Sequence, residues 1–257
     1  VLGAMARYKD WKNKPAGDPW KAPQYQREAA GELLERNGSS FTVGESDTRP
    51  ILKDYGIPVV EGEFASTGSM AAAIAENMGY PVVMKIVSPD ILHKSDMGGI
   101  RLNISDTESV LTAFYEMVED VQRKMPKARI EGVLIERMAT KGSEVIIGMK
   151  RDPSFGPMMM FGLGGIYVEL FKDVGFCISP SSREEVLAMI QSTRAGHLLA
   201  GLRGQTAADV DAIVEIVLRM ADLARDFPQI QEMEINPLRV FEEGQGALAL
   251  DGRIILG

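Results

Sequence analysis

Apolar residues recur along most of the chain at the spacings of amphipathic helices. The segment Asp106–Lys124 is followed by Pro126 and carries apolar residues on one helical face, which predicts a long helix. A second long helix is predicted over Thr206–Asp226. Shorter helices are predicted over Gln26–Arg36, from Ser46 as N-cap to Gly56, over Ser69–Asn77 and over Ser182–Gln191.

Short apolar runs lie between these helices and are typical of strands. The runs are Ile57–Glu63, Pro81–Val87, Gly99–Ile104, Gly132–Arg137, Glu144–Lys150, Val174–Ser179, Gln231–Phe241, Ala247–Leu250 and Arg253–Leu256. The glycine-rich run near residue 160 predicts a further strand with a tight loop. Long helices kept apart from clusters of short strands favour an α+β layered fold over a strictly alternating parallel one.

The first 44 residues differ from the rest in charge and composition. They hold seven Lys and Arg against five Asp and Glu, together with both tryptophans, Trp11 and Trp20, and three prolines. This composition is typical of an irregular linker or docking arm, followed here by one helix. We therefore expect an N-terminal arm over residues 1–44 and a folded domain over 45–257.

Composition narrows the classes of function. The chain has 257 residues and a net charge of −8, which argues against a nucleic-acid-binding domain. One cysteine, Cys177, and two histidines, His93 and His197, exclude a Cys/His zinc site within the chain. No apolar run is long enough to cross a bilayer, and no signal-peptide pattern occurs at the N-terminus. We expect a soluble, cytoplasmic protein without a membrane or nucleic-acid partner.

Lys85, near the end of the strand predicted over Pro81–Val87, is the first candidate for chemistry. A lone strand lysine is more often a surface residue whose stem covers apolar neighbours. The loop that follows changes this picture, because it holds His93, Lys94 and a Gly98-Gly99 pair. Glycine-rich backbone can close over phosphate oxygens while lysines supply positive charge.

Two familiar nucleotide-binding patterns are absent from the sequence. It contains neither a Walker P-loop nor the Gly-x-Gly-x-x-Gly dinucleotide fingerprint, and Gly162-Leu163-Gly164-Gly165 has the wrong spacing. A conventional P-loop or Rossmann site is therefore not expected.

A possible metal site lies near the C-terminus. In a strand, Glu234 and Asn236 project to the same face, and Asp251 would join them if its strand lies alongside. Oxygen donors of this kind suit magnesium. The alternatives are a polar strand face exposed to water and a simple turn at Asn236-Pro237.

These motifs, in this order, resemble the ATP-grasp superfamily. They are Met84-Lys85, the His93–Gly99 loop, Leu134–Met138, and Glu234–Leu238 ahead of Asp251-Gly252. Within it, Gly148–Pro157 and Phe161–Gly165 resemble the nucleotide-binding subunit or domain of ADP-forming acyl-CoA synthetases, acetate–CoA ligases related to succinyl-CoA synthetase. The resemblance covers about residues 45–257. It implies an ATP-grasp fold in which two α+β subdomains clasp a nucleotide, with a smaller lobe over 59–127 and a larger one over 128–257.

The resemblance also implies an activity and a partner. The expected reaction is acid + CoA + ATP to acyl-CoA + ADP + phosphate, with ATP/ADP and Mg²⁺ bound by this chain. A CoA-binding alpha subunit or fused domain would carry a phosphohistidine and bind the acid, so a hetero-oligomer is expected. The alternatives are a self-sufficient ATP-grasp carboxylate–amine ligase and a regulatory nucleotide-binding module of a fused acyltransferase.

The resemblance assigns a role to each motif. It implies Lys85 at the phosphates, the hinge residues Glu136, Arg137 and Met138 at the adenine, Glu144 at the ribose or nucleotide, Gly162, Gly164 and Gly165 near the phosphates, and Glu234, Asn236 and Asp251 at Mg²⁺. The three glycines could equally form a tight turn with no ligand.

The resemblance separates the two histidines. His93 looks like a second phosphoryl acceptor, a role that suits neutral imidazole, although a loop histidine can also merely hydrogen-bond a neighbour. We interpret His197 as a packing or surface residue. Cys177, between Phe176 and Ile178, is interpreted as a buried strand residue rather than a nucleophile.

Overall fold

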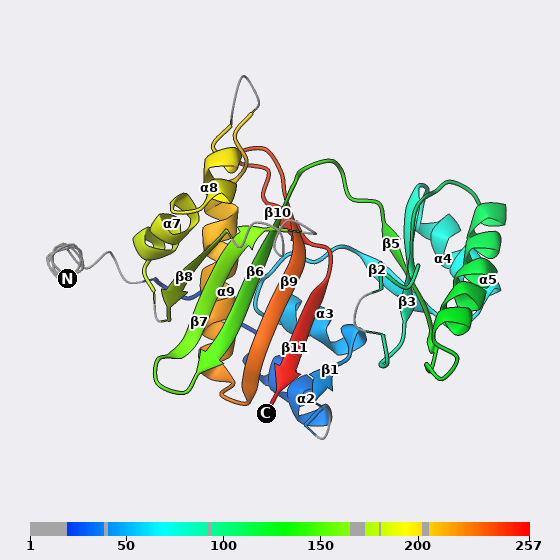
Figure 1. Cartoon of the computed structure of the whole chain (residues 1–257), viewed down its shortest axis with the longest axis horizontal. Helices are drawn as coiled ribbons and strands as arrows, with labels where there is room; N and C mark the ends of the chain where they lie inside the picture. The colour runs from blue at the N-terminus through cyan, green and yellow to red at the C-terminus, as the bar shows by residue number, and fades with distance from the viewer. Residues whose placement is uncertain (1–19, 39–40, 92–93, 165–172, 180, 202–205) are drawn as a thin grey trace, which may run out of the picture.

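Two separate apolar cores divide the molecule into a larger and a smaller lobe that lie side by side (Figure 1). The computed structural model describes residues 20–38, 41–91, 94–164, 173–179, 181–201 and 206–257. This layout, with mixed helices and sheets in two lobes, agrees with the predicted α+β fold of two subdomains.

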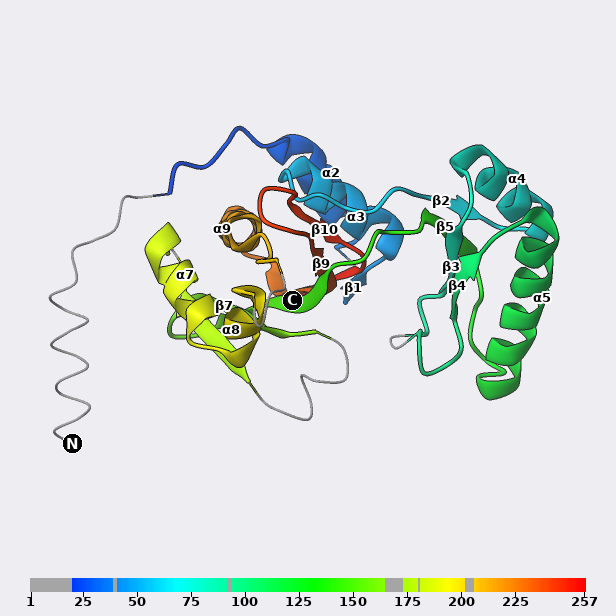
Figure 2. The same ribbon diagram turned by 90° about the horizontal axis from the view of Figure 1, so that it is seen from above.

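The larger lobe is built on an antiparallel sheet of seven strands. Its order is β1-β11-β9-β6-β7-β8, and β10 pairs with β9 off this path. The strands are β1 (Thr42–Val43), β6 (Ser143–Asp152), β7 (Gly156–Leu163), β8 (Val174–Ile178), β9 (Ile230–Val240), β10 (Ala247–Ala249) and β11 (Gly252–Leu256). The helices are α2 (Arg27–Arg36), α3 (Glu45–Asp54), α7 (Arg183–Gln191), α8 (Arg194–Leu199) and α9 (Val210–Asp226). Figure 2 shows α2, α3 and α9 on one face of this sheet.

Helix α9 supplies much of the larger core. Its apolar residues recur at helical spacing, and those on one side are buried against the sheet. The helix begins at Val210 rather than at the predicted Thr206, because the Asp209 side chain caps it by accepting a hydrogen bond from Ala212 N at 3.0 Å.

The smaller lobe has a four-stranded antiparallel sheet in the order β2-β5-β3-β4. Its elements are β2 (Gly62–Ala65), α4 (Gly68–Met78), β3 (Val82–Val87), β4 (Ile100–Ile104), α5 (Thr107–Lys124) and β5 (Gly132–Arg137). The two helices bury their apolar sides against the sheet to form its core. The lobe therefore includes β5, beyond the predicted boundary at residue 127, because β5 pairs with both β2 and β3.

The segment before residue 45 belongs in part to the larger lobe. Ala30 and Leu34 of α2 and Val43 of β1 are buried in its core, and β1 pairs with β11. The described part of the predicted arm is thus integrated into the lobe from α2 onward. These apolar side chains are removed from water by packing against the same sheet as α9.

Several predicted elements shift or were missed. Helix α3 is capped by Gly44 rather than Ser46, and β2 begins at Gly62 although Ile57–Glu63 was predicted as a strand. Helix α8 and strand β1 were not predicted. Within the described residues, no helix has the length and apolar character needed to span a membrane.

Candidate functional site

Lys85 lies at the junction of the two lobes. In β3 it pairs with Leu134 of β5 and Ile100 of β4, and only 6% of the residue is exposed. Its Nζ lies 2.8 Å from Glu136 Oε2 and donates to the carbonyl oxygen of Leu250, in the larger lobe, at 2.6 Å. Lys85 is therefore not a surface residue. Groups from both lobes compensate its buried charge.

The three predicted metal ligands come together next to this junction. Asn236 Nδ2 donates to Glu234 Oε1 at 3.2 Å, and Asn236 N donates to the Asp251 carbonyl oxygen at 3.1 Å. Strand β11 pairs with β9 so that Gly252 lies opposite Ile235. The expected side-by-side placement of the two strands is therefore present.

The donor set fits magnesium in its chemistry. Two carboxylates and an amide oxygen are hard donors, and Mg²⁺ usually keeps water and substrate phosphates among its other ligands. Glu234 also contacts Arg253 at 3.3 Å, and its side chain is 35% exposed, so it is open to a ligand. Within the described ranges, no group of three His, Cys, Asp or Glu side chains converges as a metal site.

Lys94 brings a second ammonium group to the same place. Its Nζ lies 2.5 Å from Glu45 Oε2 and 3.6 Å from Asp251 Oδ2. Burial is the largest single influence and lowers the pKa of Lys94, but Asp251, Glu45 and Glu136 together raise that pKa above its ordinary value. Lys94 is therefore a cation beside a candidate metal ligand.

The hinge residues are placed differently from one another. The Glu136 side chain, 2% exposed, is turned into the junction, where it pairs with Lys85 and with Arg49 of α3. Arg137 N donates to Glu61 O at 3.1 Å, and Met138 N donates to Pro81 O at 3.4 Å. Contact of these residues with adenine stays a prediction.

Glu144 and the glycines lie on β6, on β7 and just beyond it. Glu144 Oε1 accepts a hydrogen bond from Arg239 at 2.5 Å, and its side chain is 43% exposed. A Cβ on Gly162 would come within 3.0 Å of Asp173 O, and one on Gly164 within 3.2 Å of the Val145 carbonyl carbon. These glycines thus allow close backbone packing whether or not a phosphate binds nearby. His93 and Gly165 lie outside the described residues.

Sequence reasoning missed two charged residues of α3, Glu45 and Arg49. Arg49 is 9% exposed, and its Nη1 lies 3.8 Å from Glu45 Oε1. A usable signal was present: Arg49 is three residues before the buried Leu52, hence on the apolar side of an amphipathic helix. A charge on that side implies a buried partner.

His197 is a surface residue, as predicted, and Cys177 lies on a strand but is less buried than predicted. His197 is exposed on α8. Cys177, on β8, is half-buried and packs against the larger core. Neither is part of the candidate site.

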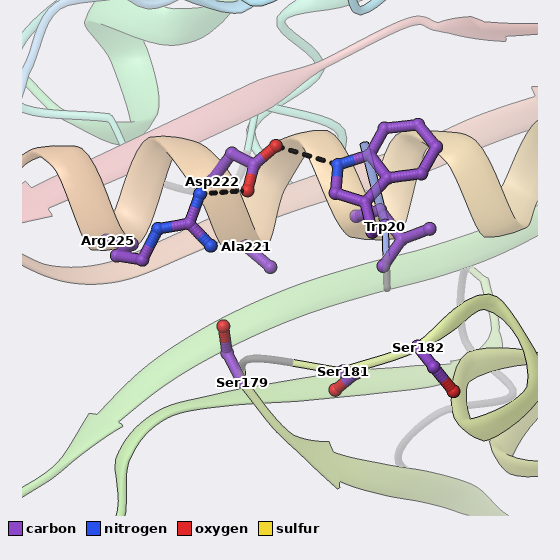
Figure 3. A pocket seen from close by; sticks show the side chains of 8 residues that line it. Trp20, Ser179, Ser181, Ser182, Ala221, Asp222 and Arg225 are labelled. Atoms are coloured by element: carbon purple, nitrogen blue, oxygen red, sulfur yellow. Dashed lines mark hydrogen bonds and ion pairs between the residues drawn. The ribbon is translucent and has the colours of Figure 1, made fainter. Parts of the chain in front are cut away.

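A cavity of about 270 Å³ lies in the larger lobe between α9 and the segment joining β8 to α7 (Figure 3). Trp20 closes it from one side. Its Nε1 donates to Asp222 Oδ2 at 2.8 Å, and Arg225 Nη2 donates to Asp222 Oδ1 at 2.5 Å. Ser179, Ser181 and Ser182 line the opposite side of the cavity, and of these only the Ser179 hydroxyl points towards Asp222 and Arg225. All of Asp222's polar contacts are internal, so we assign the cavity to anchoring of the N-terminal segment.

Comparisons with known proteins agree with this geometry. A family model described as an ATP-grasp domain matches residues 35–256. The chain is 47% identical over 234 residues to an ADP-forming acetate–CoA ligase I of Archaeoglobus fulgidus, covering 90% of this chain and 34% of that protein. It is 43% identical to the beta subunit of ADP-forming acetate–CoA ligase I of Pyrococcus furiosus, covering 88% of this chain and 97% of the subunit.

The chain thus spans about a third of the first relative and nearly all of the second. Among solved structures, the dinucleotide-forming acetyl-coenzyme A synthetase 1 of Ca. Korarchaeum cryptofilum superimposes with a TM-score of 0.84 at 39% identity. That match covers 89% of this chain and 100% of the other. Another structure of the same synthetase holds coenzyme A and Mg-AMPPCP, with a phosphohistidine segment pointing towards the nucleotide-binding site.

Proposed function

The chain belongs to the ATP-grasp family, and from this membership we propose that it is the nucleotide-binding component of an ADP-forming acyl-CoA synthetase, an acid–thiol ligase. The observation that carries the proposal is the meeting of Lys85, from the smaller lobe, with the Leu250–Asp251 corner of the larger lobe beside Glu234 and Asn236. Cationic and hard-oxygen groups converging between two lobes suit a magnesium nucleotide.

Each residue has a part in this assignment. Lys85 would compensate charge on the phosphates as the γ-phosphoryl group is transferred. Glu234, Asn236 and Asp251 would hold Mg²⁺, which neutralises charge on phosphate oxygens. Arg137, Met138 and Glu144 would bind the adenine and ribose. Burial of Lys85 keeps water away from its ammonium and strengthens its attraction for phosphate.

A CoA-binding partner, either a separate subunit or a fused domain, would complete the enzyme. Relatives of both kinds support this, since one is a beta subunit of nearly the same length and another is about three times as long. The relatives' names include acetate and 4-hydroxybutyrate, so we propose a carboxylic acid as the substrate, selected on the partner. The single cysteine agrees with a cytoplasmic location.

His93 is proposed as the acceptor that relays the phosphoryl group between the nucleotide and the partner's histidine. The proposal rests on the family resemblance of the His-Lys-Ser-Asp motif and on the position of the next residue, Lys94, at Asp251. We expect His93→Asn to abolish net acyl-CoA synthesis while leaving Mg-ADP affinity within about threefold of the unmodified chain. Full turnover by this variant with its partner present would exclude the relay.

The function is tested by measuring nucleotide binding and turnover separately. The isolated chain should bind Mg-ADP in calorimetry, should lose most of that affinity in excess EDTA, and should form no acyl-CoA. Adding the CoA-binding partner from the same genome should produce acyl-CoA and transfer ³²P from labelled ATP to protein. Robust activity of the chain alone would instead favour the carboxylate–amine ligase. Binding without any partner-dependent turnover would favour the regulatory module.

A further inference from the structure

Five charged side chains form an unbroken chain across the lobe junction, with cations and carboxylates alternating. Lys94 Nζ lies 2.5 Å from Glu45 Oε2, and Glu45 Oε1 lies 3.8 Å from Arg49 Nη1. Arg49 Nη1 donates in turn to Glu136 Oε1, and Glu136 Oε2 lies 2.8 Å from Lys85 Nζ. Arg49 stands at the centre of this chain, because it hydrogen-bonds Glu136 and lies within ion-pair distance of Glu45 Oε1, a buried atom without a hydrogen-bond partner among the described residues.

The two lysines at the ends of this row of charges contact two consecutive residues of the larger lobe. Lys85 Nζ donates to Leu250 O at 2.6 Å, and Lys94 Nζ lies 3.6 Å from Asp251 Oδ2. Asp251 is one of the candidate magnesium ligands. The two ammonium groups therefore converge on the place where the nucleotide phosphates are proposed to bind.

The surroundings hold Arg49 in one position. The residue is 9% exposed, and its Nη2 donates to the carbonyl oxygen of Val60. Gly62 leaves the necessary room, because a Cβ there would lie 2.9 Å from Glu136 Cγ and 3.1 Å from Arg49 Nη2. A guanidinium group offers five N–H donors in a rigid fork, which suits a residue that hydrogen-bonds a carboxylate and a carbonyl while facing a second carboxylate.

We propose that Arg49 is a positioning residue for phosphate binding, acting through Glu136 on Lys85 and through Glu45 on Lys94. The inference deepens the proposed function and rests on it. The charge balance gives the physical reason: Arg49 is one of three cations that balance the carboxylates of Glu45, Glu136 and Asp251. Without Arg49, three carboxylates face two lysines and draw their ammonium groups away from the ligand.

The first experiment compares a ligand with phosphates to one without. In the full chain, Arg49→Met should weaken Mg-ADP binding by about tenfold or more, measured by calorimetry, because a charged contact network of this kind is lost. Binding of adenosine, followed by ligand-detected NMR, should change less than about twofold. Arg49→Lys keeps the charge but not the fork, and should recover part of the affinity.

A double-mutant cycle tests whether Arg49 acts through Lys85. In a Lys85→Met background, Arg49→Met should cost clearly less Mg-ADP affinity than in the unmodified chain, since the group it positions is gone. The matched control is Arg151→Met, which removes an arginine that donates to Ala224 O at 2.5 Å and Ile230 O at 3.0 Å, away from the junction. This control should leave Mg-ADP affinity unchanged.

The possible outcomes separate the inference from the proposed function. If Arg49→Met fails to fold, Arg49→Gln, which keeps an N–H donor for Glu136, is expected to show the same selective loss for ADP. Equal loss for ADP and adenosine, unchanged ADP affinity in a folded variant, or equal costs in both backgrounds of the cycle would overturn the positioning role. If the unmodified chain does not bind Mg-ADP, the proposed function itself fails, and the inference that rests on it fails too.

Discussion

Lys85 shows how burial turns a common surface residue into a candidate for chemistry. Its ammonium is almost fully enclosed, with Glu136 on one side and the Leu250 carbonyl on the other. A charge in such a place must be compensated, and two groups from different lobes do so. Lys85 is thus a direct polar link between strand β3 of the smaller lobe and Leu250 of the larger one.

Replacing Lys85 by methionine keeps the aliphatic stem and removes the charge. We expect Mg-ADP affinity to fall by roughly 100-fold, since a buried charged hydrogen bond to phosphate is lost. The matched control is Lys150→Met, because Lys150 pairs with Glu232 at 2.7 Å with its side chain 74% exposed. Calorimetry should show unchanged affinity for this control. Similar losses in both variants would contradict a specific role for Lys85.

The Cys177 thiol is expected to react slowly. Burial raises its pKa above the ordinary value; Glu185 adds to this effect, and a hydrogen bond from Ser181 Oγ opposes it. Because the thiolate is the reactive form, iodoacetamide at pH 8 should label Cys177 at least about tenfold more slowly than a model peptide thiol. The rate should rise as pH increases towards 10, and unfolding in urea should remove the difference. Fast labelling of the folded chain at pH 8 would show that the thiol is activated.

At the residue scale, the sequence was enough to find most of the candidate site residues but not the ion pairs that join them. Lys85, Glu234, Asn236 and Asp251 stand in recognisable local motifs, and the structure brings them to one corner. Arg49 stands in no such motif, and its partner Glu136 is 87 positions away along the chain. Glu136 itself was interpreted as a hinge residue, since local sequence cannot reveal that an ion pair turns it inward.

Among the elements, the N-terminal segment and α9 show how one buried carboxylate joins distant parts of the chain. Asp222, 1% exposed on α9, accepts hydrogen bonds from Trp20 Nε1 at 2.8 Å and from the Tyr25 hydroxyl at 2.7 Å (Figure 3 shows the first). Burial and the neighbouring Asp222 raise the pKa of Tyr25, so its hydroxyl stays a donor. Residues 20–25, just before α2, are therefore held against α9 of the larger lobe.

Asp222→Ala should release that segment. We expect a loss of about 1–3 kcal/mol in the free energy of unfolding, because three donors, on Trp20, Tyr25 and Arg225, lose a charged acceptor. In a Trp11→Phe background, Trp20 fluorescence should shift to the red as its indole meets water. Asp211→Ala on the same helix is the control, since its side chain is 84% exposed, and it should cost less than about 1 kcal/mol. An unshifted spectrum would mean that packing alone holds Trp20.

Long periodic elements were predicted more reliably than short ones. Helix α5, with 18 residues, agrees with the sequence pattern to within a residue, because Asp106 caps its start and Pro126 follows its end. The two-residue β1 and the six-residue α8 were missed, since neither is long enough to show a period. The partner of β5 could not be predicted either: pairing with β2 and β3 depends on tertiary contacts rather than on local pattern.

In the whole molecule, two neighbouring stretches of backbone connect the lobes. The chain enters the smaller lobe at β2 and leaves it at β5, and Gly62 pairs with Glu136 across these two strands. Arg49 and Glu136 pair at this point, so the five charged side chains run across the place where the two connections between the lobes lie next to each other.

Because their cores are separate, we expect the two lobes to unfold locally and independently of each other. Met117→Ala, in the smaller core, should cost about 2–5 kcal/mol and should speed hydrogen exchange in β3 and α5 more than in α9. Met220→Ala, equally buried in the larger core, is the matched variant and should produce the reverse pattern. Uniform acceleration across both lobes in either variant would show that they unfold as one unit.

The pairing of β1 with β11 bears on how the chain is made. Thr42 lies opposite Ile255, so the first described strand must wait for the last before it gains its partner. The smaller lobe, by contrast, is encoded without interruption from β2 to β5 and can fold as soon as that stretch leaves the ribosome. Synthesis therefore places a finished lobe in the middle of a nascent chain whose leading helices are still uncovered. The larger lobe, which begins first, is completed last.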